Sequence, residues 1–307
     1  FANMEINETT ILDDRGFVKI NGDEAKSFLQ NIVTNDIEKI TDSLTLFSSI
    51  FTPQGKYLYE FFILKFEDGY LLECEKKLTS EIIKIFDFYK LRTKVNLIDV
   101  SKKYTNIIIS LEKFKEITKT EHVKGSTLSC EKGSTLSCEN ERIYVDSRHK
   151  NLGAKIITKI ENAENIIKKL DLKKIDKKNY YEKSFALGIP QLNLTKLKDK
   201  IFGIENNLDE LNGIDFKKGC YIGQENTSRI KLRNKLRRRI LPVQKITGEI
   251  SENDIIKYKD SEIGKIMIDK PYSFALIKVI EPDLKEFTNT ELTCGKSKVK
   301  ILKPEWI

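Results

Sequence analysis

Apolar runs separated by turn residues mark much of the first third of the chain. Residues 45–51 and 57–66 flank a Pro-Gln-Gly turn, and residues 70–74 follow an Asp-Gly turn. Apolar runs separated by such turns predict strands paired as antiparallel hairpins. Residues 10–20 alternate around an Asp-Arg-Gly step, which predicts a further strand, turn and strand.

Other segments have the three- and four-residue spacing of an amphipathic helix. Asn21-Gly22-Asp23 stands before an apolar series through residue 32, which predicts a capped helix there. Residues 78–89 have the same helical spacing. Residues 263–267, 274–280 and 297–302 are short apolar runs separated by Pro and Gly, so a small β module is expected from about residue 241.

Length and composition narrow the class of protein. With 307 residues the chain exceeds the usual size of one hydrophobic core, so we expect two or three modules. No run of about 18 apolar residues occurs, and the first residues carry acids rather than a basic segment before an apolar one. We therefore expect no membrane association and, with no targeting segment seen, a cytoplasmic, bacterial-type location.

Five cysteines are spread along the chain without a C-x-x-C pair, so the sequence predicts no metal site and indicates a reducing compartment. Cys130 and Cys138 belong to an exact repeat, since residues 124–131 recur at 132–139. A duplication tolerated in a surface loop or hairpin explains the repeat, because loops accept insertions at low cost. The alternative is a redox or metal clip formed by the two cysteines.

One cysteine has a distinctive setting. Residues 217–225 read Lys-Lys-Gly-Cys-Tyr-Ile-Gly-Gln-Glu and precede an expected helix start. Ammonium groups and a helix N-terminus favour thiolate over thiol, so Cys220 is the candidate reactive group and Lys218 its electrostatic partner. The alternative is an ordinary buried small residue beside a glycine turn.

This segment and its flanks resemble the signature of the YgfZ-type folate-binding proteins, relatives of the glycine-cleavage T-protein (aminomethyltransferase). Further segments similar to that family follow in order along most of the chain. They are residues 20–25, 28–30, 34–36, 51–56, 89–95, 146–148, 152–153, 188–190 and 207–209.

The resemblance implies an α+β fold with antiparallel sheets and helices around a central channel, followed by a C-terminal β-barrel. The expected regions are 1–240, with an insertion loop at about 120–140, and 241–307. It also implies a tetrahydrofolate-binding accessory protein for assembly or repair of iron–sulfur enzymes, which would support tRNA modification indirectly. Its expected partners are folate and iron–sulfur client or assembly proteins. The folate contacts it implies are Asn35, Asp36, Gln54, Lys56, Arg92, Gln224, Glu225 and Arg229.

Two other functions compete with this interpretation. One is a tetrahydrofolate-dependent aminomethyltransferase or demethylase, which would need an acid facing the pterin. The family pattern also has an arginine between Arg148 and Arg229, and this sequence has none there, which weakens the case for such an enzyme. A basic RNA-binding module is suggested by residues 229–239, where seven of eleven residues are basic, yet the run holds no aromatic residue. Direct nucleic-acid binding is therefore not expected. The run alternates like a strand, whereas the family resemblance favours a helix to about residue 231, a turn near Asn234 and a strand from Leu236.

Overall fold

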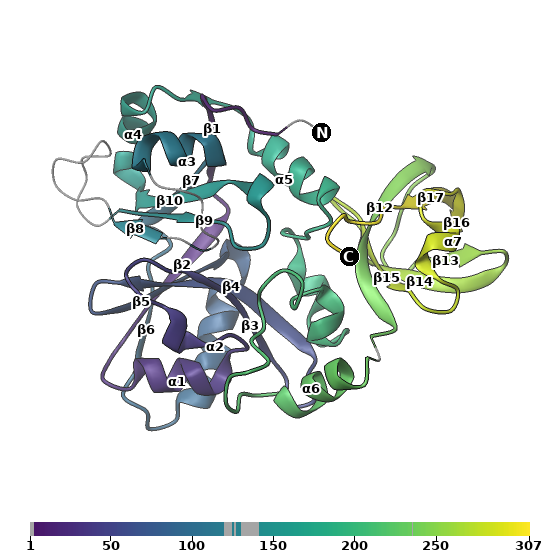
Figure 1. Ribbon diagram of the computed structural model, residues 1–307, viewed down its shortest axis with the longest axis horizontal. Helices are drawn as coiled ribbons and strands as arrows, with labels where there is room; N and C mark the ends of the chain where they lie inside the picture. The colour runs from purple at the N-terminus through teal and green to yellow at the C-terminus, as the bar shows by residue number, and fades with distance from the viewer. Residues whose placement is uncertain (1–2, 120–124, 126, 130–140, 235) are drawn as a thin grey trace.

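The computed structural model describes residues 3–119, 125, 127–129, 141–234 and 236–307. Two sheets and a closed barrel form its framework (Figure 1). The first sheet has the order β11-β1-β7-β10-β9-β8 and the second the order β3-β4-β5-β2-β6. Among the described strands, β1 and β11 pair in parallel and the other pairs are antiparallel.

The strands of the two sheets come from the first 174 residues. The first sheet consists of β1 (Glu8–Leu12), β7 (Tyr104–Ile109), β8 (Thr127–Ser129), β9 (Arg142–Val145), β10 (Ala154–Lys159) and β11 (Lys173–Lys174). The second consists of β2 (Arg15–Asn21), β3 (Leu46–Phe51), β4 (Tyr57–Phe66), β5 (Gly69–Glu75) and β6 (Asn96–Asp99). The predicted hairpins at residues 45–66 and 57–74 are confirmed as β3-β4 and β4-β5.

The C-terminal strands close into a barrel, as the family resemblance implies. Its strands are β12 (Arg238–Thr247), β13 (Ile255–Tyr258), β14 (Ser261–Ile268), β15 (Phe274–Lys278), β16 (Leu292–Cys294) and β17 (Ser297–Ile301). Inward residues such as Val243 and Ile277 form a separate apolar core with Phe287. Closure pairs every strand and so leaves no exposed sheet edge.

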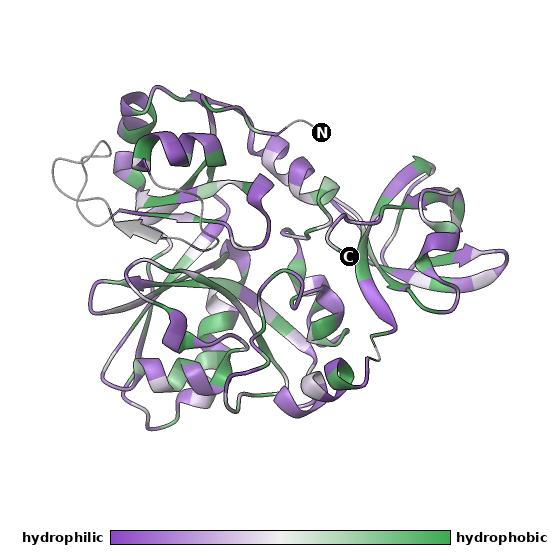
Figure 2. Ribbon diagram, in the orientation of Figure 1, coloured by the Kyte–Doolittle hydropathy of each residue, from purple (hydrophilic) through white to green (hydrophobic). Residues whose placement is uncertain are grey.

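Helices cover the outer faces of both sheets (Figure 1). On the first sheet these are α3 (Leu111–Thr118) and α4 (Ala163–Lys169), and on the second they are α1 (Ala25–Ile32) and α2 (Thr79–Lys90). The other helices are α5 (Lys177–Ala186), α6 (Gln224–Leu232), which precedes the barrel, and α7 (Leu284–Phe287), which belongs to the barrel. Six 3₁₀ turns are described, η1 (Ile37–Lys39), η2 (Lys76–Leu78), η3 (Lys150–Leu152), η4 (Ile160–Asn162), η5 (Leu194–Leu197) and η6 (Gly203–Asn206). Figure 2 shows hydrophobic residues concentrated in the strands and hydrophilic ones along surface helices such as α5.

Alternation along β4 explains how the second sheet is covered on both faces. Phe61 points to the helices, with its ring 5.7 Å from that of Phe86 in α2. Phe62 points to the first sheet, with its ring 5.3 Å from that of Tyr144. Burying an aromatic side chain of this size stabilises the fold by about 2 kcal/mol. The β4 strand is therefore apolar on both faces, as a central strand between two layers should be.

Three details differ from the sequence prediction or refine it. The strands expected within residues 10–20 form but do not pair with each other, because β1 joins the first sheet and β2 the second. The cap expected at Asn21-Gly22-Asp23 is wrong, since Glu24 occupies the N-cap of α1 without a side-chain bond. The basic run is helical to Leu232 and extended from Arg238, which confirms the helix–turn–strand alternative.

Candidate functional site

Three segments far apart in the sequence meet around Cys220. They are Thr34-Asn35-Asp36, which follows α1, the turn between β3 and β4, and the loop that leads into α6. The hydroxyl of Thr34 donates to the carbonyl of Gly213 at 2.7 Å, and the amide of Asn226 donates to the carbonyl of Gln54 at 2.8 Å. The segments singled out in the sequence thus build one region of the fold.

Lys218 ties the cysteine loop to the end of α1. Its Nζ donates to the carbonyls of Gln30 at 2.8 Å, Val33 at 2.7 Å and Asn35 at 2.9 Å. The last carbonyls of a helix have no partner within the helix, so an ammonium group placed there satisfies them and meets the negative end of the helix dipole. Burial lowers the pKa of Lys218 to about 8, although the nearby carboxylate of Asp36 opposes the shift. All three ammonium hydrogens are used, so Lys218 positions the loop.

Gly223 makes the turn from this loop into α6. Its φ is +83°, and a Cβ at this position would lie 2.5 Å from the carbonyl oxygen of Thr52. Only glycine combines a left-handed backbone with such a close approach. Gln224 then donates from Nε2 to the carbonyls of Lys218 and Gly219, both at 3.3 Å, which closes the loop on itself.

Cys220 stands at the exposed end of this braced loop, whereas Cys74 and Cys294 are buried. The ring of Tyr221 is buried beneath the loop and anchors it, with its centre 5.3 Å from Nζ of Lys218. Among the described residues, no group of three His, Cys, Asp or Glu side chains could hold a metal ion. The arrangement offers one accessible sulfur on a rigid support, suited to nucleophilic attack or to supplying one metal ligand.

Two of the predicted folate contacts lie directly under the loop. The amide of Asn35 is buried and donates to the carbonyls of Phe47 at 2.8 Å and Asn212 at 3.0 Å. Its oxygen accepts from the main chain of Asp36 at 2.8 Å, so this side chain is used within the protein. Asp36 is half-buried and accepts from Gln30 at 2.6 Å.

The other predicted contacts are spread over the surface. Gln54 is exposed at the turn, and Lys56 lies 4.1 Å above the ring of Phe202. Glu225 and Arg229 lie one turn apart on α6 and pair with each other at 2.7 Å. Arg92 is exposed on the segment that follows α2.

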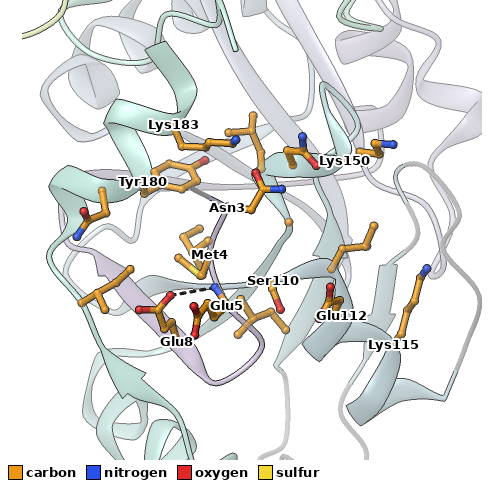
Figure 3. Close-up of a pocket in the computed structure, with 18 residues that line it drawn as sticks. Asn3, Met4, Glu5, Glu8, Ser110, Glu112, Lys115, Lys150, Tyr180 and Lys183 are labelled. Carbon is orange, nitrogen blue, oxygen red and sulfur yellow. Dashed lines mark hydrogen bonds between the residues drawn. The ribbon is translucent and has the colours of Figure 1, made fainter. Parts of the chain in front are cut away.

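A cavity of about 570 Å³ opens at another place, beside the N-terminal segment (Figure 3). Lys150 and Lys183 lie on one side of it and Glu5 and Glu8 on the other. None of the eight predicted folate contacts lines this cavity. The residue set that resembles a folate site and the roomy cavity therefore belong to different parts of the molecule.

The sequence did not identify a buried polar cluster between the sheets and α5. Arg148 pairs with Asp146 at 2.7 Å and donates to Gln191 at 3.3 Å. Burial raises the pKa of Glu60 nearby, although the charge of Arg148 opposes the shift. The Asp-x-Arg spacing could have indicated this cluster, because a carboxylate and an arginine two residues apart after a strand can pair with each other. The guanidinium of Arg148 also lies over the rings of Phe47 and Phe62 in the second sheet, at 5.2 Å and 4.9 Å, so it joins the two layers.

The basic run is largely neutralised by acids of the preceding segment. Arg238 pairs with Glu205 at 3.0 Å, and Arg239 pairs with Glu210 at 2.7 Å. Two of the three consecutive arginines thus serve to attach the barrel to the rest of the chain. A patch that is paired in this way attracts polyanions less than its sequence suggests.

The fold has a close structural counterpart among solved proteins. Glycine cleavage system aminomethyltransferase T from Bartonella henselae superposes with a TM-score of 0.74, at 11% sequence identity, over 98% of this chain and 86% of its own. The chain has the T-protein fold. The expected fold class is therefore confirmed, including the C-terminal barrel.

Curated relatives are named as iron–sulfur cluster assembly factor IBA57 homologues. The Neurospora crassa protein is 25% identical over 291 residues, which cover 92% of this chain and 61% of the relative. The Dictyostelium discoideum protein is 26% identical over 285 residues, which cover 83% and 64%. The chain thus spans somewhat less than two thirds of these relatives. No family model matches the sequence. The matches support the resemblance at the level of iron–sulfur assembly factors with a T-protein fold.

The expected cytoplasmic location is wrong on this comparison, because the relatives are named as mitochondrial proteins. In the described part of the chain, no helix is both long and apolar enough to span a bilayer. Cys130 and Cys138, on which the clip alternative depends, lie outside the described residues.

Proposed function

We propose that this protein is an accessory factor in the assembly or repair of iron–sulfur enzymes and that it works through Cys220. The observation that carries the proposal is an exposed thiol on a loop braced by Lys218 and Gly223, in a chain similar to iron–sulfur assembly factors. Bracing reduces the entropy lost when the thiol engages a partner. Support of tRNA modification would follow indirectly, through cluster enzymes that benefit.

The isolated thiol defines what Cys220 can do. Protein iron–sulfur clusters are usually held by several thiolates or imidazoles, and among the described residues Cys220 belongs to no group of three or more possible metal ligands. A cluster that passes through this site would need its other ligands from a second molecule. The proposed role is therefore transient handling of a cluster or of a client.

We further propose that a reduced folate binds the protein and that the protein resides in mitochondria. The folate proposal is supported by the T-protein fold and by the sequence resemblance. Asp36, Gln54 and Lys56 are the proposed contacts near the turn with side chains that reach solvent, whereas the amide of Asn35 is occupied by main-chain partners. The location is supported by the names of the relatives.

Complementation tests the central proposal. Cells that lack their own relative of this chain would express either the wild type or Cys220→Ser, and the activity of an iron–sulfur enzyme would be measured. We expect wild-type protein to restore activity and Cys220→Ser, which removes the sulfur but keeps the size, to restore none. Full rescue by Cys220→Ser would discard the mechanism. Calorimetric titration with tetrahydrofolate tests the folate proposal separately, and no heat of binding at millimolar ligand would reject it.

A further inference from the structure

A groove with both polar and apolar lining runs beside the cysteine loop. It lies between α1 and the end of α2 and has a volume of about 350 Å³. Its apolar lining residues are Phe28, Ile32, Tyr89 and Ile222, and its polar ones are Glu24, Ser27, Asn31 and Thr93. Ile222 stands two positions after Cys220, so the loop that presents the thiol also forms one wall of the groove. Figure 1 shows this loop passing α1 on its way to α6.

Two large apolar side chains extend from α2 beside this groove. Phe88 is 69% exposed and Leu91 is 85% exposed, and the ring of Phe88 lies 5.1 Å from that of Tyr89 in the groove. Water is an unfavourable environment for such side chains, and contiguous apolar surface of this kind marks contact sites for other molecules. We name Phe88, Tyr89, Leu91 and Ile222 the α2 patch.

The backbone at Leu91 is strained in a way that keeps this side chain exposed. Leu91 ends α2 with φ of 50° and ψ of −115°, outside the regions that leucine favours. Helices commonly end on glycine, which adopts a positive φ without cost. A leucine at this position gives up stability and gains only an exposed side chain, so packing within the chain does not explain it.

Charge around the patch indicates what it binds. Residues 84–94 hold four cations and one acid, Asp87. Lys90, Arg92 and Lys94 flank Leu91 and make no ion pair with another described residue. The groove carboxylate, Glu24, accepts the main-chain N–H of Lys94 at 2.7 Å. Apolar surface within a cationic rim complements an apolar surface within an acidic rim.

We propose that the α2 patch docks the protein that works with Cys220, and that the docking segment of this partner is amphipathic and acidic. The proposal rests on the proposed function for the identity of the thiol's task. The groove continues into the cysteine loop, so a segment seated on the α2 patch would bring its own protein next to the thiol. Apolar contacts would supply affinity, and the cations would orient the partner.

Complementation with matched variants tests the docking surface in the intact chain. Phe88→Glu combined with Leu91→Glu should abolish rescue of the iron–sulfur enzyme while the melting temperature and the labelling of Cys220 stay unchanged. Leu232→Glu is the control, because Leu232 is also 85% exposed but lies at the end of α6. Rescue by the double variant together with failure of Cys220→Ser would overturn the docking proposal alone. Rescue by Cys220→Ser would instead reject the proposed function.

A binding assay tests the chemistry of the partner. The probes are two labelled helical peptides with leucine on one face, one with glutamate and the other with lysine on the opposite face. We expect the glutamate peptide to bind at least about tenfold more tightly, with affinity that falls as salt rises. The double variant should lose this binding and Leu232→Glu should keep it. Equal binding of both peptides, preference for anionic vesicles, or a dimer closed through the α2 patch would overturn the proposal.

Discussion

Lys155 donates to Glu73 at 3.1 Å in the space between the two sheets, and both side chains are fully buried. Arg15 pairs with the other oxygen of the same carboxylate, and the hydroxyl of Tyr144 donates at 3.1 Å to the oxygen that Lys155 contacts. Lys155 and Tyr144 come from the first sheet, whereas Glu73 and Arg15 come from the second. One carboxylate therefore joins the two layers.

Removing this carboxylate should be far more costly than removing one of its partners. Glu73→Gln leaves two buried cations without a counter-ion, and we expect a loss of about 3–5 kcal/mol in the free energy of unfolding. Lys155→Met leaves Glu73 paired with Arg15 and fills a similar volume, so this variant should lose much less free energy of unfolding than Glu73→Gln. Urea unfolding of both variants measures the difference. Equal losses would show that the cluster does not depend on charge balance.

The same carboxylate should make stability depend on acid pH. Burial alone would raise the pKa of Glu73, but the charges of Arg15 and Lys155 outweigh it and lower the pKa from 4.5 to about 2. A lowered folded-state pKa stabilises the protein fully above the ordinary pKa, and this contribution disappears as pH falls from about 5 to about 2. The difference in stability between wild type and Glu73→Gln should shrink by about 3 kcal/mol over that range. Urea titrations at several pH values measure it, and a constant difference would contradict the assignment.

Much of the fold follows from local patterns in the sequence. The apolar runs on either side of the turn near Gly55 were sufficient to predict the β3-β4 hairpin, because both the runs and the turn residues are local signals. The separation of β1 from β2 was not accessible in this way. The segment contains a turn between two strands, which locally resembles a hairpin. The strands separate because β1 pairs with residues such as Ile108 of the first sheet and β2 pairs with residues such as Leu72 of the second.

The candidate site shows the same division. Cys220 could be singled out from its glycine and lysine neighbours, but the task of Lys218 could not, because its three acceptors are carbonyls more than 180 positions away. Every residue has a main-chain carbonyl, so the sequence does not show which carbonyls will accept a hydrogen bond from a distant lysine. The exposed position of Leu91 was equally hidden, since a leucine at the end of an amphipathic helix is usually buried.

Two glycines of the cysteine motif should respond differently to alanine. Gly223→Ala introduces a Cβ 2.5 Å from the Thr52 carbonyl on a backbone with φ of +83°, so we expect a loss of about 2 kcal/mol or more and a disturbed loop. Gly219→Ala is the control, because no atom lies within 4 Å of its added Cβ. Thermal unfolding and enzyme rescue measure both variants. Equal tolerance would mean that the turn against Thr52 is not required.

Thiol labelling should separate Cys220 from the two other described cysteines. Cys220 is exposed, whereas burial raises the pKa of Cys74 to about 12 and that of Cys294 to about 11. In a variant with both repeat cysteines changed to serine, iodoacetamide should modify Cys220 rapidly at neutral pH and spare the others until the protein unfolds. Peptide mass spectrometry resolves the three sites. Labelling of Cys74 at the rate of Cys220 would contradict the buried position of Cys74.

Leu91→Gly should stabilise the protein and impair its function at the same time. Glycine relieves the strain of the positive φ at the end of α2, and we expect a gain of about 1 kcal/mol in the free energy of unfolding. The exposed side chain is lost with it, so rescue of the iron–sulfur enzyme and binding of the acidic peptide should both weaken. Leu232→Gly is the matched control, since it removes an equally exposed leucine from a helical position and should give no gain in stability. Unfolding and peptide titration of the two variants side by side measure both effects. If Leu91→Gly were more stable and still bound the peptide as tightly as the wild type, the strained leucine would have no part in docking.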